Sequence, residues 1–312
     1  MSAPIIVVTG ANGLIGNAVR IALEAQGRTV LPLDRAYATE EGRPITFCDV
    51  TDIHRLHAVV HGKTLDGIVH CGAYSGPMVE RDNPSALVRV NIDGTANMLE
   101  LARIHGVRRF VFCSSTSAYG PTPPGLLTED APMVSSNVYG ASKVAGEHLV
   151  QAYRQQHGVD GVSLRLSWVY GPRRSTDCVI RTMITDAQEG RPTRLGFGAD
   201  FHRQYIHVDD AAAALLAALD APSLPAAAYN ITGGTYLTLG EVGEIVRQTI
   251  PSADIEVLPG PDPVDDVQSR FDISAAARDL GYVPRHSLES GIQSYAAWLN
   301  SRRNPQKTEE KL

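Results

Sequence analysis

A glycine-rich turn near the N-terminus constrains this sequence more than any other feature. The run Thr9-Gly10-Ala11-Asn12-Gly13-Leu14-Ile15-Gly16 follows an apolar segment and opens a stretch whose apolar residues recur at helical spacing until Gly27. Between a strand and a helix, such glycines allow a tight turn and a close approach of the backbone to a pyrophosphate. The turn therefore favours a dinucleotide site over an ordinary strand–helix turn. The residues predicted to contact the dinucleotide here are Gly10, Asn12, Gly13, Leu14, Ile15 and Gly16.

The apolar segments of the first half indicate the fold around this turn. They show little polar alternation, which is typical of strands buried on both faces of a parallel sheet. Helical patterns lie between them, including Ala86–His105. This alternation predicts an α/β fold with a doubly wound, parallel Rossmann sheet. Strands are expected at Ile5–Thr9, Thr29–Asp34, Ile45–Asp49, Gly67–His70, Arg109–Ser114 and Val162–Leu166.

The second half predicts a smaller, loop-rich substrate lobe. Pro and Gly become frequent after Gly171-Pro172. We expect residues 1–168 to form the cofactor domain, with returning segments near 205–235, and residues 169–312 to form mainly the substrate lobe. The polar tail 301–312 is expected to be disordered. Helices are expected at Asp209–Leu219, with Asp209 as its cap, and at Glu241–Thr249 and Leu288–Leu299.

Composition excludes several classes of function. The net charge of −6 lacks the basic excess of a nucleic-acid-binding protein. The four cysteines have no zinc spacing, so neither a metal nor a disulfide is expected. The longest apolar helical run, Ala211–Leu219, is too short to span a membrane, and no signal peptide is recognisable. These features predict a cytoplasmic protein.

Acidic residues at two strand ends refine the cofactor prediction. Asp34 lies about 20 residues beyond the glycines, where a carboxylate can accept hydrogen bonds from the adenosine ribose and repel a 2′-phosphate. This favours NAD over NADP, although the neighbouring Arg35 could pair with a 2′-phosphate if it is not simply solvated. Asp49, followed by Val50, could accept from the adenine amino group, cap the helix before Ile53, or do both.

Two further motifs suggest the chemistry. Tyr139 and Lys143 are four residues apart and therefore share one face of a helix. A nearby ammonium favours the ionised phenol, which could then remove a proton from a substrate hydroxyl. Ser114 and Ser115 end the fifth strand, on the edge of the sheet where ligands collect. Each motif alone has an ordinary alternative, a surface helix pair and a serine-rich turn, but their order in one chain favours an active site.

Together these residues resemble the extended short-chain dehydrogenase/reductase family, in particular its NAD-dependent sugar epimerase/dehydratase branch. Thr9–Gly16 is similar to the family's TGxxGxxG, Ser114–Gly120 to SSxxVYG, Tyr139–Lys143 to YxxxK, and Val90–Thr95 to VNxxGT. The resemblance implies catalytic roles for Ser115, Tyr139 and Lys143. It also implies cofactor contacts for Cys71, Gly72, Ala73, Asn91, Ser114, Tyr139 and Lys143.

The resemblance continues through the second half. Leu164–Arg173 is similar to LRxxNVYGPR, Arg203–Asp210 to RDFIYVDD, Tyr229–Gly234 to YNIGxG, and Phe271–Ala276 to xDISKA. Two departures bear on the substrate. Trp168 replaces an asparagine that touches the substrate, and Pro263 lies where many relatives have an arginine for a diphosphate, while Arg203 keeps the other arginine position. The implied substrate contacts are Ser75, Ser115, Thr116, Tyr139, Trp168 and Arg203.

Three functions follow from these expectations. The first is a nucleotide-sugar epimerase, preferred over a dehydratase because Thr116 and Ser117 replace the acidic pair common in dehydratases. The second is a dehydrogenase of a free sugar, sugar acid or hydroxy acid that releases NADH, suggested by Trp168 and Pro263. The third is a catalytically silent NAD-binding regulator, which the presence of the three catalytic residues disfavours. The resemblance also implies a homodimer formed through the helices Ala86–His105 and Tyr139–His157.

Overall fold

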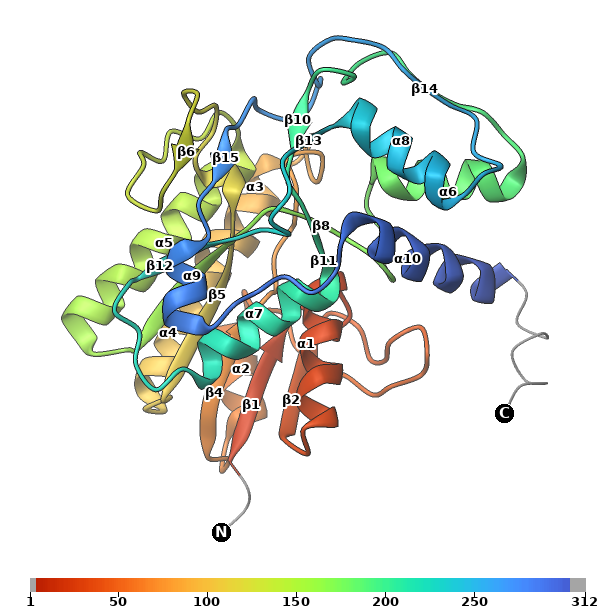
Figure 1. Cartoon of the computed structure of the whole chain (residues 1–312). Helices are drawn as coiled ribbons and strands as arrows, with labels where there is room; N and C mark the ends of the chain where they lie inside the picture. Colours follow the sequence, from red (N-terminus) through yellow and green to blue (C-terminus); the bar gives the residue numbers. More distant parts are fainter. Residues whose placement is uncertain (1–3, 304–312) are drawn as a thin grey trace.

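The predicted apolar runs form one parallel sheet in the computed structural model, which describes residues 4–303 (Figure 1). Its strands are β1 (Ile5–Thr9), β2 (Thr29–Asp34), β3 (Thr46–Phe47), β4 (Leu65–His70), β5 (Arg109–Ser115), β7 (Gly161–Leu166) and β12 (Ala228–Ile231). Their order is β12-β7-β5-β4-β1-β2-β3, and every neighbouring pair is parallel. The order reverses between β1 and β4, so the crevice for a ligand lies at their carboxyl ends. The predicted doubly wound fold is confirmed.

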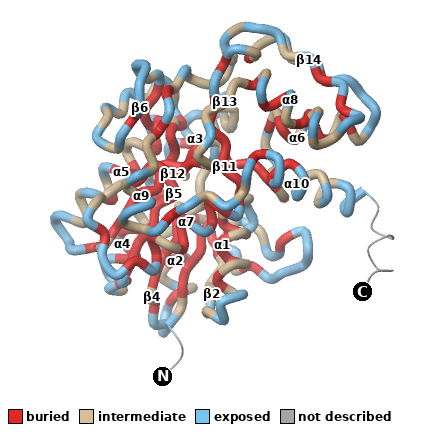
Figure 2. The backbone as a smooth tube through the Cα atoms, in the orientation of Figure 1, coloured by how far each residue is buried: buried red, intermediate tan, exposed pale blue. Residues whose placement is uncertain are grey.

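Helices cover both faces of the sheet, which explains why its strands are apolar throughout. Ile6 and Val8 of β1 pack on one face with α1 (Leu14–Ala25), α7 (Val208–Asp220) and α9 (Ser274–Leu280). Val7 faces the other side, toward α2 (Ile53–Val60), α4 (Gly94–Ile104) and α5 (Val138–His157). Successive side chains of a strand point to opposite faces, so both kinds of position must be apolar here. Figure 2 shows the buried backbone concentrated in these central strands.

Three predicted elements differ in detail. The strand expected at Ile45–Asp49 is reduced to β3 at the sheet edge, where it pairs with β2. The helix expected at Ala86–His105 is divided into α3 (Pro84–Val88), a π-helical turn η1 (Arg89–Asp93) and α4. The helix α7 is capped by His207, not by Asp209, because the His207 ring accepts the Asp209 N–H at 3.3 Å. Asp209 lies in the first turn, where its charge favours the helix dipole.

A second apolar core lies above the carboxyl ends of the sheet strands, at the upper right of Figure 1. It joins α6 (Val179–Glu189), α8 (Leu239–Thr249) and α10 (Leu288–Arg303). The helices predicted at Glu241–Thr249 and Leu288–Leu299 are therefore present. This part also contains paired β9 (Thr193–Leu195) and β14 (Ile255–Val257). The other short pairs are β8 (Trp168–Tyr170) with β11 (Tyr205–His207), β10 (His202–Arg203) with β13 (Leu237–Thr238), and β6 (Leu126–Leu127) with β15 (Arg270–Phe271).

The tail prediction was wrong for its first residues. Ser301–Arg303 form the end of α10, and the rest of the predicted tail, 304–312, lies outside the described residues. Within residues 4–303, every helix is too short or too polar to cross a bilayer.

Candidate active site

A cavity of about 460 Å³ runs along the carboxyl ends of β1, β2, β4 and β5 and reaches β8. It is the space that the sheet topology assigns to a ligand. The glycine-rich turn borders one end, and Ser115, Tyr139 and Lys143 border the middle. Of the predicted cofactor residues, the lining includes Gly10, Asn12, Gly13, Leu14, Ile15, Gly16, Asp34, Arg35, Asp49, Val50, Cys71, Gly72, Ala73, Ser114, Tyr139 and Lys143.

The glycine-rich turn has the backbone geometry that a dinucleotide needs. Gly10 adopts φ +64°, and a Cβ there would lie 2.8 Å from the Cys71 carbonyl oxygen. A Cβ on Gly16 would overlap the Gly10 carbonyl oxygen, so both positions require glycine. Gly13 caps α1 without any side-chain hydrogen bond. The first amides of the helix are therefore free to bind a phosphate, as an NAD site requires.

The predicted ribose carboxylate and its basic neighbour lie beside this turn. Asp34 accepts the Asn12 N–H at 2.9 Å and the Arg35 N–H at 2.6 Å. The Arg35 guanidinium does not extend freely into solvent. It donates to the Tyr74 hydroxyl at 3.2 Å and lies 5.3 Å from the centre of that ring. Tyr74, which the sequence analysis missed, thus closes the adenosine end of the cavity with Arg35.

Asp49 also lies at this end, but it does not cap a helix. Its carboxylate accepts the N–H and the hydroxyl of Thr51 at 2.9 and 2.8 Å. The cap of α2 is Asp52, which accepts the Arg55 N–H. Of the two roles predicted for Asp49, helix capping is wrong, and contact with adenine stays a prediction.

Asn91 supports the cavity from behind instead of lining it. Its side-chain oxygen accepts the Tyr74 N–H at 2.9 Å, and its amide donates to the Tyr74 carbonyl and to Ser142. Asn91 belongs to the π-helical turn η1, which is a common feature of functional sites. It therefore positions the segment after β4. Asn91 itself is not among the residues that line the cavity, and the cofactor contact predicted for it stays a prediction.

Ser114 and Ser115 point in different directions. The Ser114 hydroxyl donates at 2.5 Å to Glu147, whose carboxylate is also bound by Arg165 at 2.8 Å. Arg165 in turn donates to the hydroxyl of Tyr119. Ser114 also borders the cavity, but its hydroxyl belongs to this buried network. The Ser115 hydroxyl instead donates to the Ser117 hydroxyl at 3.2 Å.

The remaining catalytic candidates come together on α5. Asn137 caps this helix by accepting the Gly140 N–H, and the first turn then carries Tyr139. Lys143, one turn later, is buried and donates to the Cys113 carbonyl at 2.8 Å, with its ammonium 5.7 Å from the Tyr139 ring. The phenol, the ammonium and the Ser115 hydroxyl therefore border one region of the cavity.

The predicted substrate residues divide into two groups. Ser75, Thr116 and Trp168 line the cavity beyond Ser115. Arg203 does not line it; it borders a separate cavity of about 10 Å³ behind Trp168. Arg203 is therefore absent from the wall of the main cavity, and the substrate contact predicted for it stays a prediction.

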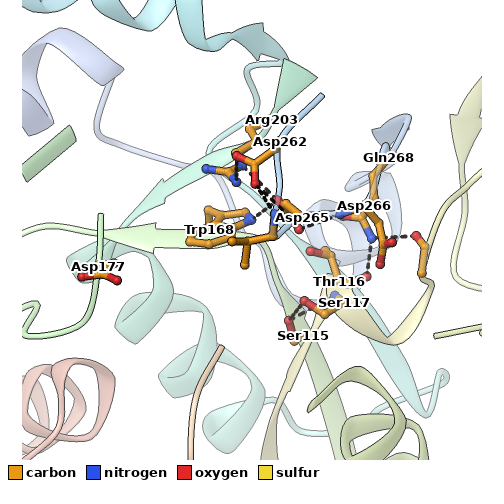
Figure 3. Close-up of polar contacts among 12 residues, drawn as sticks. Ser115, Thr116, Ser117, Trp168, Asp177, Arg203, Asp262, Asp265, Asp266 and Gln268 are labelled. Carbon is orange, nitrogen blue, oxygen red and sulfur yellow. Dashed lines mark hydrogen bonds and ion pairs between the residues drawn. The ribbon is translucent and has the colours of Figure 1, made fainter. Parts of the chain in front are cut away.

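Arg203 is instead enclosed by two carboxylates and an indole ring (Figure 3). It donates to Asp262 at 2.6 Å and to Asp265 at 2.9 Å, and its guanidinium lies 4.2 Å from the centre of the Trp168 ring. The Trp168 N–H donates to the same Asp265 at 2.6 Å. Burial raises the pKa of Asp265, while Arg203 and Trp168 oppose that effect.

Arg174 is a cavity residue that the sequence analysis did not select. It lines the wall next to Trp168, with its guanidinium 5.5 Å from the centre of that ring. The pair Arg173-Arg174 is visible in the sequence, but nothing local shows which arginine faces inward. In the structure, Arg173 turns away to pair with Glu41 at 2.9 Å.

His207, Asp209 and His286 are the nearest approach to a metal site among residues 4–303. Both nitrogens of His207 already have partners, the Asp209 N–H and the Ser294 hydroxyl. His286 stacks on His207 with ring centres 4.1 Å apart and contacts Asp210. These side chains therefore cap α7 and bind it to the C-terminal segment.

Comparison with known proteins agrees with this geometry. Residues 6–232 match the model of the NAD dependent epimerase/dehydratase family. The chain belongs to this family. Family membership makes it an NAD-dependent enzyme of the extended short-chain dehydrogenase/reductase type, with NAD as its cofactor.

Several relatives of this epimerase/dehydratase chain cover nearly its whole length. A dTDP-glucose 4,6-dehydratase of Streptomyces antibioticus is 30% identical over 96% of this chain and 93% of its own. A UDP-glucuronate 4-epimerase of Thermodesulfobacterium geofontis is 27% identical over 93% of this chain and 94% of its own. The solved UDP-glucose 4-epimerase of Thermus thermophilus in complex with NAD is 28% identical, covers 95% of this chain and 99% of its own, and superposes with a TM-score of 0.84.

Proposed function

We propose that this protein oxidises a secondary hydroxyl group of a sugar-like substrate, with Tyr139 as the base. One observation carries the proposal: Ser115, Tyr139 and Lys143 border the same cavity as the glycine-rich turn. A substrate hydroxyl near Ser115 and Tyr139 would thus be next to the cofactor. NAD, when bound, supplies the acceptor for the hydrogen that leaves the carbinol carbon with its electron pair.

Each residue of the group has a distinct role in this proposal. Tyr139 takes the hydroxyl proton, and the Lys143 ammonium stabilises the negative charge that develops on the phenol. Ser115 donates a hydrogen bond to the reacting oxygen, and its own position is fixed by accepting the Ser117 N–H at 3.1 Å. The Lys143–Cys113 hydrogen bond keeps the ammonium at the end of β5.

Two outcomes are open after the oxidation. In a nucleotide-sugar epimerase, the hydrogen returns to the other face of the same carbon, so no NADH accumulates. The curated relatives include UDP-glucuronate 4-epimerases, and Thr116 and Ser117 place no carboxylate beyond Ser115. In a dehydrogenase, the ketone and NADH leave. The enclosure of Arg203 favours this second candidate, because that guanidinium is not available to a diphosphate.

Replacing Tyr139 tests the shared first step. In Tyr139→Phe, the ring and its packing persist while the proton acceptor is lost, so we expect kcat to fall by roughly 10²- to 10⁴-fold. NAD affinity should change little. The measurement combines NADH absorbance with product analysis for sugars, sugar acids and nucleotide sugars. If Tyr139→Phe retained wild-type turnover, the proposal would fail and the silent-regulator alternative would gain support.

A further inference from the structure

The charges around the inner end of the cavity point to the kind of substrate, provided that the proposed oxidation takes place there. Beyond Ser115 and Tyr139, the wall contains Trp168 and Arg174. Behind Trp168 lie Arg203, Asp262 and Asp265. This region therefore holds two guanidinium groups and two carboxylates, and the position of each charge decides what can bind.

Arg203 forms ion pairs with both carboxylates and has no charge left for a ligand. The side chains of Arg203, Asp262 and Asp265 are only 5%, 4% and 9% exposed. A doubly charged diphosphate could use Arg203 only by displacing one of these carboxylates, which would leave a buried charge unpaired. That loss is costly in a buried ion pair. The region behind Trp168 is thus closed to a nucleoside diphosphate.

The segment that carries these carboxylates is fixed at several points. We call residues 262–268 the acidic strap. Within it, Asp266 accepts the Ser136 hydroxyl at 2.7 Å. Gln268 donates to the carbonyls of Thr116 and Gly120 at 2.8 and 3.0 Å (Figure 3). Because the strap is tied to Thr116 as well as to Arg203, opening it would also disturb the wall beside Ser115.

Arg174 has the opposite property: its charge is not neutralised. It donates to the carbonyls of Val169 and Asp177, which hold the side chain in place. Its Nε atom is buried and has no hydrogen-bond partner. Among residues 4–303, no carboxylate forms an ion pair with it. A cation that is held at a cavity wall without a paired carboxylate is suited to a single anionic group of a ligand.

We propose that the substrate is a free polyhydroxylated monocarboxylate, bound through its carboxylate to Arg174, and that the acidic strap excludes nucleoside diphosphates. The secondary alcohol loses its proton to Tyr139 and a hydride to NAD, which gives a ketone and NADH. No other oxidant is needed. The Trp168 ring offers an apolar face to the carbon chain of the substrate.

A paired substrate panel tests this assignment with the full-length protein and NAD. The free compounds are glucose, gluconate, glucuronate and four-carbon aldonates, and the nucleotide compounds are UDP-glucose, UDP-glucuronate and dTDP-glucose. We expect NADH from at least one monocarboxylate, no conversion of any nucleotide sugar, and no UDP binding below millimolar concentration in calorimetry. Oxidation of glucose alone, or of no free acid in the panel, would overturn the assignment.

The panel also separates this inference from the proposed function. Conversion of a nucleotide sugar that depends on Tyr139, or micromolar binding of UDP, would overturn the monocarboxylate assignment and leave the proposed oxidation intact. Bound NAD with no turnover of any compound, and no effect of Tyr139→Phe, would contradict both.

Substitution of Arg174 provides the residue-level test. In Arg174→Gln, the KM for the active acid should rise on the order of 10- to 100-fold, as expected for a lost hydrogen bond to a charged group. The KM for NAD should stay the same. The KM for the neutral amide of that acid should be equal in Arg174→Gln and in the wild-type protein. Arg173→Gln is the matched control, since Arg173 pairs with Glu41 outside the cavity. An unchanged KM for the acid in a folded Arg174→Gln protein would refute the role of Arg174.

Discussion

His70 lies buried beneath the active site, and its state of protonation affects the stability of the folded protein. Its ring is buried, with Nδ1 2.7 Å from the Thr9 hydroxyl and Nε2 3.1 Å from that of Thr95. Burial, and to a smaller degree the Lys143 charge, lowers the pKa of His70 to about 3. The ring is therefore neutral in the folded protein, and both of its nitrogens hold the residues around the turn in place.

This lowered pKa predicts a defined loss of stability in acid. The unfolded chain protonates His70 below its ordinary pKa of 6.5, whereas the folded protein does not until about pH 3. The stabilisation of the folded protein by the neutral His70 ring is thus complete above pH 6.5 and is lost progressively as the pH falls toward 3. At pH 5 the loss amounts to about 2 kcal/mol, at 1.36 kcal/mol per pH unit.

Urea unfolding at pH 7 and pH 5 measures this effect. The loss between the two pH values should be about 2 kcal/mol smaller in His70→Gln than in the wild type. His54→Gln, at an exposed position, is the control and should show the wild-type difference. Equal losses in His70→Gln and the wild type would contradict the neutral, buried ring.

The sequence predicts those site residues whose role depends on local spacing. The glycines and the Tyr139–Lys143 pair are of this kind, because a turn or one helical turn defines their relation. The alternation of side chains along β5 could also have predicted that Ser114 and Ser115 point to opposite faces of the strand. The neutralisation of Arg203 could not be predicted, because its partners lie 59 and 62 residues away in the chain. Such pairs depend on how the two halves of the fold meet.

At the scale of elements, a buried ionic network joins α5 to the sheet. Glu147 of α5 binds Ser114 of β5 and Arg165 of β7, and both charged side chains are only 6% exposed. The same helix carries Tyr139 and Lys143, so the network fixes the helix that positions them. The apolar pattern predicted β7, and the family resemblance implied α5, but a periodic pattern does not reveal which polar residues of two elements meet inside the core.

Glu147→Gln should therefore destabilise the protein strongly. It leaves the Arg165 guanidinium buried without its counter-charge, which costs about 3 to 5 kcal/mol. The double variant Glu147→Gln/Arg165→Met should recover part of this loss, because both charges are then absent. Urea unfolding at pH 7 measures both proteins. A single variant within about 1 kcal/mol of the wild type would show that Arg165 finds sufficient partners in Tyr119 and the Glu129 carbonyl.

At the scale of the whole molecule, we predict that two copies associate through α4 and α5. Val88 of the adjoining α3, Ile104 of α4 and Val138 of α5 are exposed apolar side chains, at 39%, 52% and 44%. Exposed apolar residues of adjacent helices suit a two-fold interface. Light scattering over a dilution series in the micromolar range should give twice the mass of one chain. The mass of a single chain throughout the series would contradict the dimer.

The position of β12 in the sheet has a consequence for synthesis on the ribosome. Among residues 4–303, β7 is the only strand that pairs with β12. About 60 residues separate these two strands in the chain, and they include α6, β9 and α7. At about 5–20 residues per second, the outer edge of β7 stays uncovered for roughly 3 to 12 seconds after it is made. An unpaired edge can capture a strand of another chain. The nascent protein is therefore most open to misassembly in this interval, before its substrate side has been completed.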